Sequence, residues 1–159
     1  MPVETVIEDD DWRGVAIATL ADAAVSATVR HLGLDPAAFE VALLACGDDR
    51  IAVLNADFRG LPRPTNVLSW PSEDRSPADP GLAPAPPERG ALGDIAIAYD
   101  TCAREAADQG KPLDHHVTHL LVHGVLHLLG YDHMTAEDAA LMERREVEIL
   151  ATLGVPDPY

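Results

Sequence analysis

Six of the seven histidines lie between residues 115 and 133, and their spacing strongly restricts how this chain can fold. His123 and His127 are four residues apart, so on an α-helix both imidazoles project from one face and can bind one metal ion. Gly130 predicts the end of that helix, because glycine readily adopts the left-handed conformation of a helix C-terminus. The chain can then turn back and bring His133 to the same ion. We therefore expect a three-histidine metal site at the end of a helix.

Three histidines with an open fourth position are typical of a catalytic zinc site, whereas a structural site is closed by four protein ligands. One zinc ion is the expected cofactor, although nickel, copper and iron also accept imidazole ligands. The pattern H-x-x-x-H-x-x-G-x-x-H is also that of metzincin proteases, in which a glutamate base follows the first histidine. Gly124 stands at that position and has no group that accepts a proton, so proteolysis is the less favoured interpretation.

Residues 1–159 are expected to form a single α+β domain with α/β-like layers, in which about five helices pack on a four-stranded mixed sheet. Hydrophobic patterns between glycines and prolines predict strands at 3–7, 39–46, 65–70 and 94–99. Helices are predicted at 13–31, 100–110, 112–129 and from Thr135 to about 154. A further short helix is predicted to begin at a capping Asp48, with Ile51, Leu54 and Phe58 on its apolar side. Residues 71–90 contain six prolines and no periodicity, which predicts a variable, mobile loop within the domain.

The chain carries 11 basic and 27 acidic side chains, a formal net charge of −16. This charge argues against a broad basic surface that binds nucleic acid without sequence preference, and DNA is not an expected partner. The longest hydrophobic run covers only residues 41–46, so no membrane-spanning helix is expected. The N-terminus has no signal-peptide pattern, and Cys46 and Cys102 form no C-x-x-C motif. These features predict a cytoplasmic protein with free thiols.

Arg59 precedes a glycine at the end of a short helix and is a candidate phosphate clamp, because a guanidinium binds two phosphate oxygens in a fork. A solvated loop arginine is the alternative interpretation. Thr65, Asn66 and Ser69 follow in a polar stretch and either line a substrate groove or are ordinary strand-edge and turn residues.

The segment H-G-V-L-H-L-L-G-Y-D-H at residues 123–133 resembles the signature of the YbeY family of endoribonucleases, which are rRNA maturation factors. The resemblance continues in order along the whole chain, at residues 54–59, 65–69, 92–95 and 146–150. It implies one metal ion, expected to be zinc, on His123, His127 and His133. It also implies a bacterial cytosolic, single-strand-specific endoribonuclease that acts in 16S rRNA 3′-end maturation and ribosome quality control.

Arg59 matches the functionally important arginine of that family, which favours a catalytic role. The partners that the resemblance implies are the 16S rRNA precursor and the small ribosomal subunit with its associated proteins. This chain has Asn66 where many members have Asp, which removes a possible carboxylate base. It has Trp70 where many have Phe, and this aromatic side chain either packs in the core or stacks on a base.

Five residues are candidates for positioning a ligand or contacting substrate: His119, Asp132, Asn66, Ser69 and Glu146. His119 lies four residues before His123 and shares its helix face, but a buried structural histidine fits equally well. Asp132 either orients a histidine or is a turn residue. Glu146 either bonds a metal-ligand histidine or, as we expect, is partly exposed.

Two functions of different kinds remain open besides the protease. In the first, a metal ion and Arg59 act on a scissile phosphate, with water or the substrate 2′-hydroxyl as the nucleophile. In the second, the protein is a non-catalytic ribosome-assembly factor with a structural metal. Because no segment of the chain is basic, either function predicts weak binding to free RNA and delivery by a partner such as the ribosomal subunit.

Overall fold

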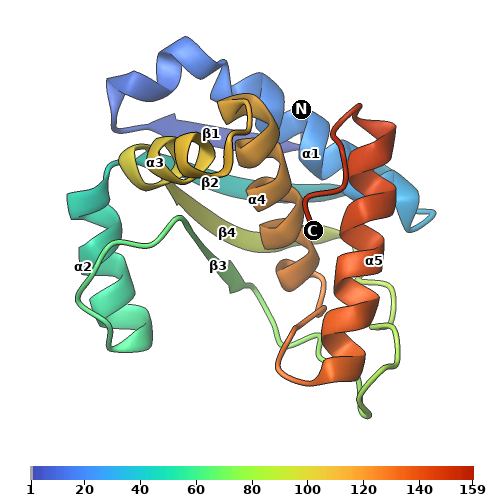
Figure 1. The fold of residues 1–159 in the computed structure, drawn as a ribbon. Helices are drawn as coiled ribbons and strands as arrows, with labels where there is room; N and C mark the ends of the chain where they lie inside the picture. Colours follow the sequence, from blue (N-terminus) through green and yellow to red (C-terminus); the bar gives the residue numbers. More distant parts are fainter. Residues whose placement is uncertain (1) are drawn as a thin grey trace.

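A computed structural model describes residues 2–159 (Figure 1). Its centre is a four-stranded sheet with the strand order β1-β2-β4-β3. The strands are β1 (Val3–Ile7), β2 (Phe39–Cys46), β3 (Val67–Pro71) and β4 (Gly90–Ala98). The β1–β2 and β2–β4 pairs are parallel, whereas β3 pairs with β4 in the antiparallel direction. The predicted four-stranded mixed sheet is therefore confirmed.

The two central strands are buried because helices cover both faces of the sheet. On one face, Ile95 and Ile97 of β4 join the main hydrophobic core, together with Leu43 of β2. On the other face, Ala96 and Ala98 belong to a second, smaller cluster. Strands that are buried on both faces are apolar along most of their length, which is the pattern that the sequence shows here.

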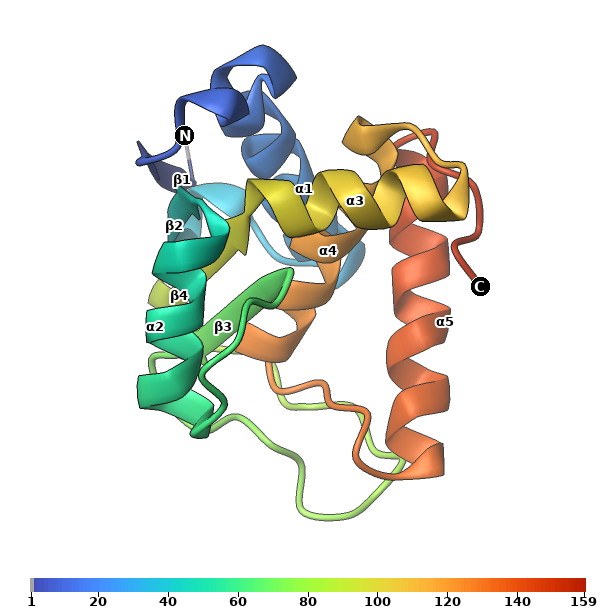
Figure 2. The same cartoon turned by 60° about the vertical axis from the view of Figure 1, so that its left-hand side comes forward.

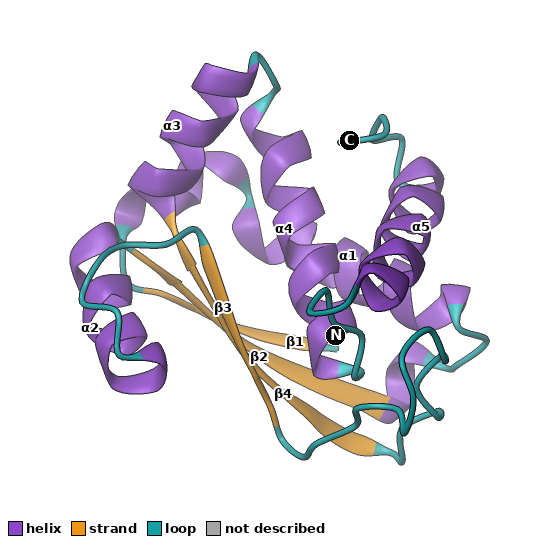
Figure 3. Cartoon of the chain, turned by 60° about the horizontal axis from the view of Figure 1, so that its bottom comes forward, coloured by secondary structure: helices purple, strands orange, loops and turns teal. Residues whose placement is uncertain are grey.

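The main core lies beneath α1 (Ile17–His31) and α4 (Leu113–Leu128), and α5 (Ala136–Thr152) packs on the outer side of α4 (Figure 3). The smaller cluster lies beneath α2 (Asp48–Arg59), which stands beside β3 (Figure 2). The remaining α-helix is α3 (Tyr99–Gln109), which contacts α4. Residues 2–159 thus contain five α-helices, as predicted, and two short 3-10 helices, Asp10–Val15 and Pro36–Ala38. None of these helices is long and apolar enough to cross a lipid bilayer.

The prediction of one helix over residues 13–31 is wrong at its N-terminal end, because α1 begins only at Ile17. A 3-10 helix covers Asp10–Val15, and Ala16 (φ 54°) separates it from α1 with a left-handed conformation. Trp12 explains the break, because it is fully buried and its indole N–H donates a 2.8 Å hydrogen bond to the Cys46 carbonyl. This anchor holds the segment across the end of the sheet, a long-range contact that helical periodicity does not reveal.

Asp48 does not cap the helix that it begins. The N-cap residue of α2 is Gly47, which has no side chain that could accept a capping hydrogen bond. The Asp48 carboxylate instead accepts hydrogen bonds from the backbone N–H and the hydroxyl of Thr101, at 3.0 and 2.8 Å, in the first turn of α3. The parallel strands β2 and β4 end at the same edge of the sheet, so the helices that follow them start side by side.

Specific contacts connect the proline-rich segment 71–90 to the rest of the fold, and its mobility stays a prediction. Pro71 and Gly90 belong to strands. The Arg75 guanidinium donates to the carbonyls of Leu92 and Leu128, and the Gly81 N–H donates to Asp138. The segment therefore connects the sheet, the end of α4 and the start of α5.

Gly93 provides a test of the β3–β4 packing. Its φ is 145°, and a Cβ atom would lie 2.1 Å from the Trp70 carbonyl oxygen and 2.9 Å from a methyl group of Leu128. We expect Gly93→Ala to lower the free energy of unfolding by about 3 kcal/mol or more, from backbone strain plus overpacking. The control is Gly110→Ala, which has a φ of 65° but meets nothing within 4 Å and should cost only about 1 kcal/mol. Equal losses in chemical denaturation would contradict the close approach.

Candidate metal centre and its cleft

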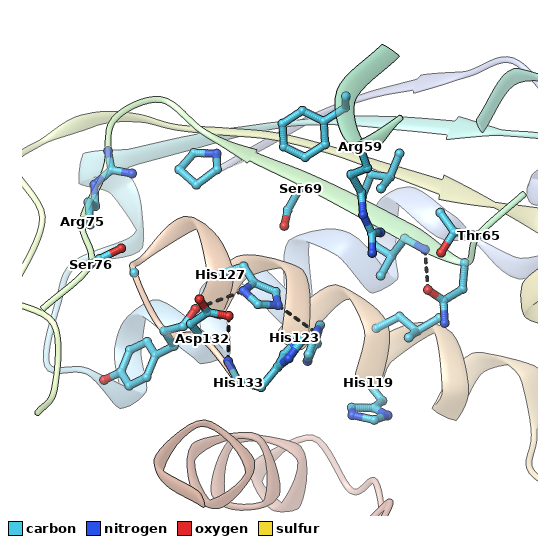
Figure 4. A pocket seen from close by; sticks show the side chains of 18 of the residues that line it. Arg59, Thr65, Ser69, Arg75, Ser76, His119, His123, His127, Asp132 and His133 are labelled. Atoms are coloured by element: carbon cyan, nitrogen blue, oxygen red, sulfur yellow. Dashed lines mark hydrogen bonds between the residues drawn. The ribbon is translucent and has the colours of Figure 1, made fainter. Parts of the chain in front are cut away.

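The three predicted metal-binding histidines converge at the C-terminal end of α4 (Figure 4). His123 and His127 lie on the last two turns of the helix. One ring nitrogen from each of these two residues and one from His133 all lie within 4.8 Å of one another. The chain turns back at Gly130, whose φ is 103°. A Cβ atom at that position would lie 2.2 Å from the Arg75 carbonyl oxygen, so the turn requires glycine for steric as well as conformational reasons.

Hydrogen bonds orient two of the imidazoles. The His123 Nδ1 atom lies 2.5 Å from a carboxylate oxygen of Glu146, and the His127 Nδ1 atom lies 3.0 Å from the Tyr131 carbonyl oxygen. Both partners are acceptors, so each Nδ1 carries the proton and each Nε2 keeps a lone pair. The two Nε2 atoms face one another at 3.0 Å. Opposed lone pairs at this distance are stable only with a cation or a proton between them.

This donor set fits a divalent metal ion. Zinc bound tetrahedrally to nitrogen at about 2.0–2.1 Å separates two ligand atoms by roughly 3.4 Å, which the observed spacing accommodates with small side-chain adjustments. The acceptors behind His123 and His127 are the outer contacts that usually hold metal-binding imidazoles in one tautomer. In front of the histidines is a cleft of about 590 Å³, so three protein ligands leave room for a further ligand.

Glu146 was expected to be partly exposed, and this expectation is wrong. Its side chain on α5 is fully buried behind His123, and it also accepts a hydrogen bond from the Tyr159 hydroxyl. Burial alone raises the pKa of this carboxyl, but the nearby imidazoles of His119 and His123 and the hydroxyl of Tyr159 outweigh it and lower the pKa to about 2. Glu146 therefore presents a carboxylate to the metal site at neutral pH.

His127 is poised to be a neutral ligand. Burial disfavours its charged form, and His123 and His133 add repulsion between cations, so its pKa falls from 6.5 to about 4. A metal ion needs the unprotonated imidazole. The local environment thus favours the protonation state that binds metal above about pH 4.

The cleft brings several other predicted site residues to the histidines. Arg59, at the last residue of α2, is exposed and points into the cleft from the opposite wall (Figure 4). Ser69 on β3 and His119 on α4 line the same cleft. His119 lies 3.6 Å from the buried Glu146 carboxylate and is only partly exposed.

Asn66 also lines the cleft, but its amide is committed to neighbouring groups. Its Nδ2 atom donates to Glu105 at 3.0 Å, and its Oδ1 atom accepts from the backbone N–H of Val67 at 2.7 Å. Glu105 in turn bonds the buried imidazole of His116 at 2.9 Å. This network connects the start of β3 to α3 and α4, so Asn66 has a structural partner that its position in the sequence did not reveal.

Asp132 makes no hydrogen bond to a histidine side chain, although its charge acts on His127 and favours the protonated imidazole. Its carboxylate accepts a 2.7 Å hydrogen bond from the backbone N–H of His133. This contact shapes the turn that returns His133 to the site, which agrees with the alternative that Asp132 is a turn residue.

Sequence reasoning missed three residues of the site. Arg75 lies in an aperiodic loop, Tyr159 lies beyond the last helix, and Phe58 was assigned to an apolar helix face, yet all three line the cleft. Only long-range contacts reveal the first two. Phe58 is 51% exposed, so the expectation that it lies on the packed side of α2 is wrong.

Gly124, at the position of the protease base, packs against the sheet. A Cβ atom there would lie 3.2 Å from a side-chain atom of Ile95. This close approach of α4 to β4 gives the glycine a packing role. Gly124 has no side chain that could act as the base of a protease mechanism.

Fold and site together define a class of protein: a single α+β domain that can hold a metal ion on three histidines and keep a coordination position open towards a cleft, as hydrolytic metal sites do. Comparison with known proteins gives the family. The family model described as "Endoribonuclease YbeY" matches residues 5–154, and the chain belongs to this family.

Curated relatives match along almost their whole length. An Endoribonuclease YbeY of Jannaschia sp. (strain CCS1) is 56% identical over 160 residues, covering 100% of both chains. That of Dinoroseobacter shibae is 59% identical over 162 residues, covering 99% of this chain and 90% of the relative. The solution structure of TM1509 from Thermotoga maritima superposes with a TM-score of 0.57, covering 96% of this chain and 91% of the other. At 19% sequence identity, this last likeness supports the fold alone.

The Glu146–His123 contact predicts a loss of metal affinity on substitution. Glu146→Gln keeps the size of the side chain but removes the charge that holds the His123 N–H, so zinc affinity should fall about 10- to 100-fold. Competition with a chromophoric chelator measures the change. Glu148→Gln is the control, because this exposed glutamate on the same helix contacts His31 instead. Equal zinc affinities for wild type and Glu146→Gln would contradict the assigned contact.

The low pKa of His127 predicts how the stability of the metal-free protein depends on pH. Between pH 6.5 and pH 4 the unfolded chain protonates this residue while the folded protein does not, so stability must fall as the pH falls. His127→Gln removes this contribution and should flatten the slope of Tm against pH in that window. Groups that do not interact with His127 contribute equally to both proteins, so the difference between the two slopes reports on His127 and the histidines that repel it. Parallel slopes would refute the assignment.

Proposed function

We propose that this protein is a metal-dependent endoribonuclease that cuts single-stranded RNA and acts in 16S rRNA 3′-end maturation and ribosome quality control. The observation that carries the proposal is the convergence of His123, His127 and His133 at a cleft whose opposite wall presents Arg59. The family supports the reaction, since its curated relatives are named endoribonucleases. The rRNA substrate and the small ribosomal subunit as partner rest on the resemblance of the sequence.

Each side chain then has a defined task. The three histidines hold the metal ion, for which zinc is our choice because three imidazoles with an open position suit it. When bound, the ion supplies Lewis acidity towards a phosphoryl oxygen and lowers the pKa of water. Glu146 keeps His123 in the binding tautomer. Arg59 binds the scissile phosphate and neutralises the charge that develops on its oxygens.

The wall between Arg59 and the histidines positions the substrate. Ser69 and His119 face the cleft and offer groups that hydrogen-bond the sugar or phosphate of a bound strand. Asn66 holds β3 in place through Glu105 rather than acting on the substrate directly. Cys46 and Cys102 are free and buried, which suits a reducing compartment, so we place the function in the cytoplasm.

Cleavage of a short single-stranded RNA by the zinc-loaded protein tests the proposal. Arg59→Ala should lower kcat by about 100-fold, the usual cost of removing one group that stabilises developing charge. His127→Ala and chelation should abolish cleavage, and added zinc should restore the chelated wild type. Arg89→Ala is the matched control for the lost charge, because Arg89 is exposed and does not line the cleft.

Contaminating ribonuclease is the main hazard, so all variants must be purified identically. Full activity of His127→Ala, or activity that survives chelation, would contradict the proposal. The second candidate, a non-catalytic assembly factor, is favoured by the net charge of −16, which suits weak RNA binding. It predicts that Arg59→Ala and His123→Ala restore ribosome maturation in cells that lack the protein.

A further inference from the structure

Phe58 is a large aromatic side chain that the fold leaves exposed at the metal-site cleft. It lies on the last turn of α2, is 51% exposed and lines the cleft directly before Arg59 in the chain. An isolated exposed aromatic residue on a protein surface needs no explanation. This one shares a cleft with three metal-binding histidines and an arginine, so its exposure there has a chemical consequence.

Trp70 contacts the Phe58 ring. The two ring centroids are 5.3 Å apart, and the ring planes meet at 62°, an edge-type contact. Trp70 itself packs against the smaller hydrophobic cluster between α2 and the sheet. Trp70 is only partly buried, so it packs against this cluster from its edge. A ring supported on one side and exposed on the other is pre-organised for stacking, which lowers the entropy lost on binding.

The charge of the cleft shows why such a ring is needed. The residues that line it include two arginines and two aspartates, so their formal charges cancel. Arg75 is one of the arginines, and its guanidinium is occupied by the carbonyls of Leu92 and Leu128 and the Ser72 hydroxyl. In a chain with a net charge of −16, the affinity for RNA that the metal ion and Arg59 do not supply must come from uncharged contacts. Stacking of a base on an aromatic ring is such a contact.

We propose that Phe58, supported by Trp70, is the stacking platform for one unpaired nucleobase of the substrate, while the adjacent Arg59 binds a phosphate of the same strand. The inference rests on the proposed endoribonuclease function and deepens it. A base inside a duplex is stacked on both faces and cannot cover the ring, so the platform selects unpaired RNA. Specificity for single strands therefore resides in an aromatic side chain outside the metal site.

An abasic scan tests this platform. Single-stranded RNAs of about ten nucleotides, each with one base removed at a different position, are cleaved by zinc-loaded wild type and Phe58→Leu. With wild type, one position near the cleavage site should lose about tenfold in kcat/KM when its base is absent. Phe58→Leu keeps apolar contact with Trp70 but offers no ring, so it should lose about tenfold on intact RNA, mainly in KM, and show no abasic penalty at that position.

Matched variants separate stacking from folding and from general hydrophobicity. Phe58→Trp should restore cleavage of intact RNA and the abasic penalty. Val53→Ala, at an exposed apolar residue of the same helix outside the cleft, should cleave like wild type. Thermal unfolding of each variant controls for stability.

The outcomes distinguish this inference from the proposed function. If wild type cleaves RNA but Phe58→Leu cleaves it equally well, or keeps the same abasic penalty, the platform is refuted and the endoribonuclease function stands. If zinc-loaded wild type cleaves no RNA, both fall together. The platform is supported if removing the base lowers kcat/KM for wild type and Phe58→Trp but not for Phe58→Leu.

Discussion

The hydrogen bond between Glu146 and His123 is the interaction on which the site depends. It links α5 to α4 across the core at a carboxylate that is fully buried. A buried carboxylate without partners is costly, so the packing of the two helices is stable only with the surrounding donors in place. The same contact fixes the proton of His123 on Nδ1 and turns the Nε2 lone pair towards the cleft. The same contact therefore determines both how α5 packs on α4 and how the His123 imidazole is oriented.

A second group of contacts fixes where α4, the helix that carries His123 and His127, ends. Arg75 donates to the Leu128 carbonyl at the last residue of α4, and its own carbonyl lies against Gly130. A cation at this place also compensates the partial negative charge of the helix C-terminus. Because the same guanidinium bonds the Leu92 carbonyl of β4, the helix end is held at a set position over the sheet. The return of His133 to the other two histidines follows from that placement.

Much of this arrangement could be predicted from local sequence. The spacing of His123 and His127, the glycine at position 130 and the apolar central strands are patterns that one element carries by itself. The missed features depend on contacts between distant segments, such as Trp12 bonding the end of β2, or Asp48 bonding the first turn of α3. Helical periodicity assigned Phe58 to the packed side of α2, yet the helix ends beside an edge strand and leaves that residue uncovered. Arg75 and Tyr159 carry no local signal, because only their long-range partners define their roles.

The net charge of −16 limits where such a chain can bind RNA. In the cleft, by contrast, the formal charges of the Arg and Asp residues cancel, so the cleft is less repulsive to phosphate than the rest of the chain. Under the proposed function, recognition relies on the metal ion, Arg59 and the Phe58 ring, while the acidic remainder of the chain repels phosphate. X-ray absorption at the metal edge of the purified, zinc-loaded protein tests the central claim most directly. The account predicts one zinc per chain with three imidazole nitrogens at about 2.0–2.1 Å and a further light-atom ligand. A sulfur ligand, fewer than three imidazoles, or an unchanged spectrum in His127→Ala would contradict it.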